Sequence, residues 1–90
     1  MSEYFLDAVF ALQNLPAVAD IRGFGMLAGI DVVPQGAAGM RGMRLQRALF
    51  DAGLHIKTTG DAAILAPPLI IEKSQIDEMC QILRDVLKAI

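Results

Sequence analysis

The stretch VADIRGFGMLAGIDVV at residues 18–33 decides the fold of this chain. Its two halves, Val18–Arg22 and Met26–Val33, are short and rich in apolar and β-branched residues, and a glycine pair separates them. Segments of this kind on either side of glycines are typical of two adjacent β-strands. Pro34 ends the second strand because proline has no backbone N–H to donate to a sheet. The chain is therefore predicted to contain a β-hairpin in this region.

Amphipathic helices are expected on both sides of this hairpin. The first begins near Ser2 and ends before Pro16, with apolar residues at helical spacing at Phe5, Ala8, Val9 and Leu12. The second runs from about Met40 to Ala52 after an entry that Gly36, Gly39 and Gly42 loosen, and its predicted buried stripe is Leu45, Ala48, Leu49 and Ala52. The third begins at the S-x-x-D signal Ser74–Asp77, and its predicted stripe is Ile76, Met79, Cys80, Leu83, Leu87 and Ile90.

Two further strands, Leu54–Thr58 and Ala62–Ala66, are predicted on either side of the turn Thr59-Gly60-Asp61. The order of elements is then αββαββα, without an internal repeat or a linker. Paired strands with helices between the pairs favour the α+β class, here a small, mostly antiparallel sheet with helices packed on it. Residues 1–90 are expected to form a single domain.

The composition excludes several classes of protein. Apolar residues make up 54% of the 90 residues and charged residues 20%, which excludes disorder. The longest apolar run, Ala62–Ile71, contains two prolines and is too short for a membrane span, and no signal peptide is recognised. The single cysteine, Cys80, excludes an intramolecular disulfide. A net charge of −2 favours neither nucleic acid nor a membrane as partner, and Arg41, Arg44 and Arg47 fit the solvated stripe of a helix.

The apolar content is high for so small a domain, which has few buried positions to offer. We therefore expect either an apolar surface or a surface that another part of a larger protein covers. A cytoplasmic location fits the use of a single cysteine.

Residues Gly23–Ala28 match G-x-G-x-x-A, the fingerprint of dinucleotide-binding domains. That motif must open a helix whose N-terminus meets the pyrophosphate. Here the β-branched residues Ile30, Val32 and Val33 follow and favour a strand, and no acidic residue lies about 20 residues further on. The glycines are therefore interpreted as structural.

Three side chains carry groups that could take part in chemistry. His55 would share a strand face with Lys57 and could act as a base, but no nucleophile lies near it in the sequence, which favours an exposed rim histidine. Cys80 lies on an apolar helix stripe and is expected to be a buried, inert thiol. Lys57 either presents its ammonium group to a ligand carboxylate or is a solvated strand lysine, and local sequence leaves both readings open.

Five ordered blocks resemble the class III (omega-amino acid) aminotransferases, which use pyridoxal 5′-phosphate. The first block, Ala19–Asp31, is similar to the pattern D-[IV]-R-G-x-G-[LM]-[LM]-x-G-[IL]-[DE] of that family. The others are Leu49–Leu54, Thr59–Asp61, Leu65–Leu69 and the final helix from Ile76. The blocks recur in the family's order with similar spacing, so the resemblance spans nearly the whole chain.

The resemblance implies that the chain is the C-terminal small domain of a fold type I pyridoxal-phosphate enzyme and a fragment of a longer protein. The missing large domain would carry the Schiff-base lysine and the other cofactor contacts, since Lys57, Lys73 and Lys88 do not lie in the family's Schiff-base context. The fragment alone is then expected to bind no pyridoxal phosphate and to be inactive. The full enzyme would be a homodimer or larger, and would transfer an amino group from an amine or omega-amino acid to an oxo-acid such as pyruvate.

The resemblance also implies one substrate contact. In the family's G-L-h-h-R-x-x-G segment, an arginine binds the substrate carboxylate, and Lys57 stands at that position within Gly53–Gly60. An ammonium group keeps the charge but loses the planar bidentate fork of a guanidinium. Arg22 matches the arginine of the first block, and we assign it a structural or inter-domain role, with its partner expected in the absent domain.

Two alternatives stay open from the sequence. The chain could be a stand-alone α+β module whose apolar face mediates binding or oligomerisation without catalysis. It could also belong to another class III activity, such as an aminomutase, that shares the same fold.

Overall fold

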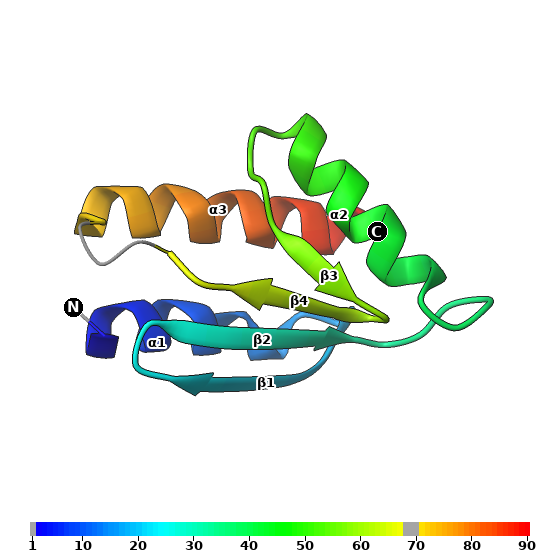
Figure 1. Ribbon diagram of the computed structural model, residues 1–90, viewed down its shortest axis with the longest axis horizontal. Coiled ribbons are helices and arrows are strands. Elements are labelled where there is room, and N and C mark those ends of the chain that lie inside the picture. Colours follow the sequence, from blue (N-terminus) through cyan, green and yellow to red (C-terminus); the bar gives the residue numbers. More distant parts are fainter. Residues whose placement is uncertain (1, 68–70) are drawn as a thin grey trace.

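A computed structural model describes residues 2–67 and 71–90 of the chain. Its elements in chain order are α1 (Ser2–Phe10), a 3₁₀ turn η1 (Ala11–Asn14), β1 (Val18–Phe24), β2 (Leu27–Val32), α2 (Met40–Asp51), β3 (Lys57–Thr59), β4 (Ala62–Leu65) and α3 (Lys73–Ala89). The strands form one antiparallel sheet in the order β1-β2-β4-β3 (Figure 1). The predicted α+β class and the αββαββα order are confirmed.

The β1–β2 hairpin shows why its two glycines are structural. Phe24 pairs with Leu27 across a two-residue turn in which Gly25 has φ +59°. Glycine at the first central position is typical of a type II′ turn, whose twist suits a hairpin. Gly23 faces α1, and a Cβ there would lie 2.5 Å from Cδ2 of Leu6. A strand follows these glycines, so the interpretation that they are structural is confirmed.

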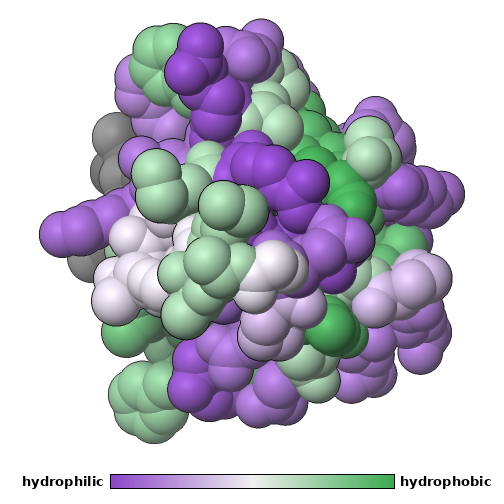
Figure 2. Space-filling model, turned by 90° about the vertical axis from the view of Figure 1, so that its right-hand side faces the viewer, coloured by the Kyte–Doolittle hydropathy of each residue, from purple (hydrophilic) through white to green (hydrophobic). Residues whose placement is uncertain are grey.

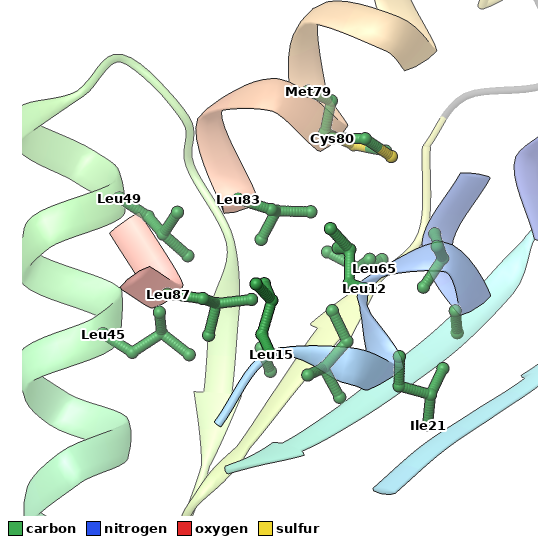
Figure 3. Packing of buried hydrophobic residues seen from close by; sticks show 14 of the residues in the cluster. Leu12, Leu15, Ile21, Leu45, Leu49, Leu65, Met79, Cys80, Leu83 and Leu87 are labelled. Atoms are coloured by element: carbon green, nitrogen blue, oxygen red, sulfur yellow. The ribbon is translucent and has the colours of Figure 1, made fainter. Parts of the chain in front are cut away.

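One face of the sheet carries the hydrophobic core. Side chains from the helices and from η1 meet the inward residues of the sheet, and Figure 3 shows Leu12 of η1, Leu65 of β4 and Leu83 of α3 among them. Ile30, Val32, Ala63 and Leu65 alternate with exposed or half-buried neighbours along their strands, as expected for a sheet with one covered face. Most of the predicted helix stripes are confirmed as buried, including Cys80.

The other face of the sheet, called the open face below, carries Arg22, Phe24, Leu27, Asp31, Lys57 and Ile64. Phe24 is 87% exposed, Leu27 53% and Ile64 38%. A solvated face of an antiparallel sheet is normally polar, so the exposed side chains of Phe24, Leu27 and Ile64 form an unusual apolar surface. The apolar surface expected from the composition is thus located in part on this face.

Several boundaries differ from the sequence prediction. α3 begins at Lys73, and Glu72 rather than Ser74 precedes it as the cap, with its N–H donating to Oε1 of Gln75 over 2.8 Å. β3 begins only at Lys57, so Leu54, His55 and Ile56 lie outside the strand. Ala52 is exposed, and Gly42 takes a buried position inside α2 instead of loosening its entry.

The prediction that Arg41 lies on a solvated stripe is wrong. Its guanidinium donates to the carbonyl oxygens of Val33 and Ile90, both over 2.9 Å, because the chain end returns to the start of α2. Around this end of the molecule, Figure 2 shows apolar and polar residues interspersed on the surface. The side chain of Ser2, the expected cap of the first helix, is outside the described part of the chain, and so are Pro68 and Leu69 of the block Leu65–Leu69. Among the described helices, none combines the length and apolar character needed to cross a bilayer.

Candidate functional site

Lys57 is the first residue of β3, the strand at one edge of the sheet. It pairs with Ile64, which lies on the open face, and side chains of directly paired residues share a face. The same row continues across the sheet to Gly29 and Arg22. Lys57 is exposed, and no carboxylate among the described residues forms a salt bridge with it.

A groove of about 540 Å³ runs between α2 and the segment that enters β3. Met43, Gln46, Arg47 and Phe50 line it from the helix, and His55, Ile56 and Lys57 line it from the strand side. Its walls are mostly apolar, and Lys57 and Arg47 bring positive charge, although Arg47 also lies 3.9 Å from Asp51. This arrangement suits an anionic group attached to an apolar body.

The segment after Lys57 is fastened to α2 by contacts that sequence reasoning missed. Oε1 of Gln46 accepts the N–H of Thr58 over 3.2 Å and its hydroxyl over 2.7 Å. The carboxylate of Asp61 accepts the N–H groups of Gly39 and Gly42, each over 3.0 Å. The β3–β4 turn therefore caps the N-terminus of α2, where a negative charge is favourable.

His55 has a packing role at the rim of this groove. Its ring lies 4.4 Å from that of Phe50, with the planes tilted by 47°. Its side chain is exposed, so the expected rim position is confirmed. His55 lies outside β3, which removes the basis for placing it on one strand face with Lys57.

Arg22 has its partner within the chain, which corrects the expectation of a partner elsewhere. Its Nη2 lies 2.8 Å from Oδ1 of Asp31 on the neighbouring strand. Gly29 pairs with Arg22, and the Arg22 guanidinium lies over it. A Cβ atom added to Gly29 would lie 3.5 Å from Nη2 of Arg22. Side chains of the pair are 63% and 33% exposed, so its contribution to stability is small.

Two groups between α1 and α3 have shifted pKa values but lie among packing residues. Burial raises the pKa of the Cys80 thiol, and the nearby charge of Asp77 adds to this effect. The hydrogen bond that the Tyr4 hydroxyl donates to Asp77 raises the pKa of Tyr4. A buried thiol with a raised pKa is a poor nucleophile, in agreement with the prediction for Cys80. The described residues contain no group of three His, Cys, Asp or Glu side chains placed to hold a metal ion.

The profile of the aminotransferase class-III family matches residues 1–87. An omega-aminotransferase from Caulobacter vibrioides is 44% identical over 85 residues, which are 93% of this chain and 19% of that protein. A putrescine–pyruvate aminotransferase from Pseudomonas aeruginosa is 35% identical over 82 residues, which are 84% of this chain and 18% of that protein.

Solved structures give the same result. A transaminase solved with L-ala superposes with a TM-score of 0.95 at 28% identity, over 98% of this chain and 22% of that one. The adenosylmethionine-8-amino-7-oxononanoate aminotransferase from Methanocaldococcus jannaschii gives a TM-score of 0.86 at 29% identity, with the same shares. The chain thus spans about a fifth of the length of these relatives. The chain belongs to the class III aminotransferase family.

Proposed function

We propose that residues 1–90 are the C-terminal small domain of a longer pyridoxal-phosphate-dependent aminotransferase. The whole enzyme would transfer an amino group from an amine or omega-amino acid to an oxo-acid such as pyruvate. Family membership supports this reading over a stand-alone binding module. So do the names of the relatives and the small share of their length that this chain matches.

The described residues do not themselves fit pyridoxal phosphate. A Schiff-base lysine needs a pocket that holds and tunes the cofactor, and here Lys57, Lys73 and Lys88 are all exposed. Lys73 lies instead over the ring of Tyr4, with Nζ 5.2 Å from the ring centroid. We therefore place the chemistry of the cofactor in the rest of the enzyme and give this domain a share in substrate binding.

The proposed substrate contact is Lys57, and the observation that carries it is its place at the groove. The ammonium group stands at the sheet edge beside mostly apolar walls, without a salt bridge to the described carboxylates. Such a cation can bind the carboxylate of an amino donor or an oxo-acid while the apolar walls face the rest of the molecule. A single ammonium group holds a carboxylate with less directional preference than the guanidinium that the family resemblance implies at this place.

The open face is the proposed contact surface for the remainder of the longer protein. Relatives and solved homologues carry about four fifths of their length outside the matched region. α1 and α3 already cover the opposite face of the sheet, whereas Phe24, Leu27 and Ile64 remain exposed. A neighbouring domain seated on this face would bury these side chains and bring the Lys57 edge towards its own groups.

The experiment compares the longer protein with the 90-residue chain, each incubated with pyridoxal phosphate and then freed of unbound cofactor. The longer protein is expected to keep the absorption band of bound cofactor and to convert pyruvate, and the chain alone to keep neither. An absorption band retained by the 90-residue chain alone would contradict the proposal that the cofactor is bound by the rest of the enzyme. In the longer protein, Lys57→Ala is expected to lower kcat/KM for pyruvate about 10- to 100-fold, the range for a lost charged hydrogen bond. Lys57→Arg, which keeps the positive charge, should retain most of the activity.

A further inference from the structure

We infer that Gln46 is a positioning residue for Lys57, because it holds the peptide group that follows the Cα atom of Lys57. The inference rests on the proposed function of Lys57 as the contact for the substrate carboxylate. It assigns the groove, which Gln46 also lines, a second determinant of substrate preference that acts through Lys57.

The contact is made at the peptide bond between Lys57 and Thr58. The N–H of this peptide donates to Oε1 of Gln46 over 3.2 Å, and the Thr58 hydroxyl donates to the same oxygen over 2.7 Å. β3 is an edge strand with three residues, so few sheet hydrogen bonds define its path. Gln46 thus supplies two hydrogen bonds immediately after Lys57, where the sheet supplies few.

Gln46 can hold this peptide because α2 is itself held against the same hairpin. Asp61 accepts the N–H groups of Gly39 and Gly42 one to two turns before Gln46. Gly42 also packs on Gly60, because a Cβ atom added to Gly42 would lie only 1.9 Å from the carbonyl oxygen of Gly60. Residues 39, 42 and 46 lie on one side of the helix, so the Gln46 side chain extends from a braced surface towards Thr58.

Loss of this contact should change substrate preference more than it changes general activity. A freed Lys57–Thr58 peptide can rotate and swing the Cα–Cβ bond of Lys57, which misplaces the ammonium group relative to the carboxylate. Under the proposed function, groups in the rest of the enzyme would hold the reacting carbonyl, so an acceptor that lacks a carboxylate should be affected little. Lysine is long and flexible and recovers part of the contact, so we expect a loss of about 3- to 10-fold for the acid, below that of Lys57→Ala.

The test uses the longer protein that carries this chain, after it has taken up an amino group from a donor. Pyruvate and propanal are the acceptors. The measured quantity is the kcat/KM for pyruvate divided by that for propanal. Gln46→Ala should lower this ratio about 3- to 10-fold. Gln81→Ala is the control, because the Gln81 side chain donates to Asp85 on α3, and it should leave the ratio unchanged. Thr58→Val, which removes one of the two donors, should give a smaller decrease and serves if Gln46→Ala does not fold.

The outcomes separate the inference from the proposal beneath it. A decrease of the ratio in both Lys57→Ala and Gln46→Ala supports both. A decrease of the ratio in Lys57→Ala alone overturns the positioning role of Gln46 and leaves the substrate contact of Lys57 intact. The same conclusion follows if Gln46→Ala and Thr58→Val each lower kcat/KM equally for both acceptors. An unchanged ratio in Lys57→Ala overturns the proposed role of Lys57 and the inference with it.

Discussion

Gly42 of α2 packs directly on the carbonyl group of Gly60, so that a Cβ on Gly42 would lie 1.9 Å from that oxygen. The same Cβ would lie 3.0 Å from the carbonyl carbon of Gly60 and 3.1 Å from Cα of Asp61. All three are backbone atoms, which cannot rotate away as a side chain can. The close approach lets Asp61 reach the N–H groups at the start of α2.

Gly42→Ala is therefore expected to destabilise the chain, although alanine favours helices over glycine by about 1 kcal/mol at exposed sites. Separating α2 from the hairpin should cost about 3 kcal/mol or more, at the upper end for overpacked sites. Urea unfolding followed by circular dichroism measures the difference. Gly29→Ala is the matched control, because its new Cβ meets Arg22 at 3.5 Å, an ordinary contact, and should change stability by less than about 1 kcal/mol. Equal stability of Gly42→Ala and the native chain would contradict the close packing.

The fold could be predicted from the sequence because its signals are local. Apolar residues at helical spacing marked the stripes that Phe5, Leu45 and Leu83 now bury, and the glycine pair marked the hairpin. The ends of elements were less predictable, since Glu72 caps α3 through a contact with Gln75 that competes with the signal at Ser74.

The surroundings of Lys57 could not be predicted, because they depend on contacts between elements far apart in the sequence. Thr58 meets Gln46 and Asp61 meets Gly39 only after α2 has folded back on the hairpin. One signal was available: Gly42 is a poor helix former inside a helical pattern, which often indicates close backbone packing. Lys57 itself was identified through the family resemblance, and the structure adds its position at the groove.

Phe24→Ser should change the stability of the longer protein much more than that of the 90-residue chain. In the 90-residue chain Phe24 is 87% exposed, so the free energy of unfolding should change by less than about 0.5 kcal/mol while self-association decreases. In the longer protein the same change should cost about 2 kcal/mol, because there the ring would be buried against the rest of the enzyme.

Met43→Ser is the control for this pair of measurements, since Met43 is 72% exposed but lies on α2, outside the open face. Size-exclusion chromatography and binding of a hydrophobic dye report the behaviour of the chain, and thermal unfolding reports that of the longer protein. A monomeric native chain that binds no dye would show that the open face does not need a partner. Equal effects of the two variants in the longer protein would show that the partner does not sit there.

Tyr4 offers a spectroscopic check on the packing of α1 against α3. The hydrogen bond from its hydroxyl to Asp77 raises its pKa, with smaller contributions from burial and from the charge of Asp77. The chain has one tyrosine and no tryptophan, so the near-ultraviolet absorbance of tyrosinate reports this group alone. Asp77→Asn should lower the pKa towards its ordinary value of about 10, because the charged acceptor is lost. Asp85→Asn, on the same helix but bonded to Gln81, should leave the titration unchanged.

Cys80 should be protected in the folded chain and reactive in the unfolded one. Burial raises the pKa of its thiol, so less thiolate is present at a given pH, and the surrounding core limits access of reagents. Labelling at pH 8 by a disulfide reagent should be at least about a hundredfold slower in the native chain than in denaturant, since reaction requires opening of the structure. Equal rates would show that the contact between α1 and α3 is open in solution.

The raised pKa of Cys80 also sets the sign of a pH effect on stability. The unfolded thiol loses its proton at about pH 8.5, whereas the folded thiol keeps it to higher pH, so the folded state binds more protons in between. Its contribution to the free energy of unfolding is therefore complete below that pH and is lost as the pH rises through the folded pKa. Cys80→Ala removes the titrating group, so denaturant unfolding at pH 7 and pH 10 should show a smaller loss of stability in the variant. An equal loss in both chains would assign the pH effect to other groups, such as Tyr4, whose pKa is also raised.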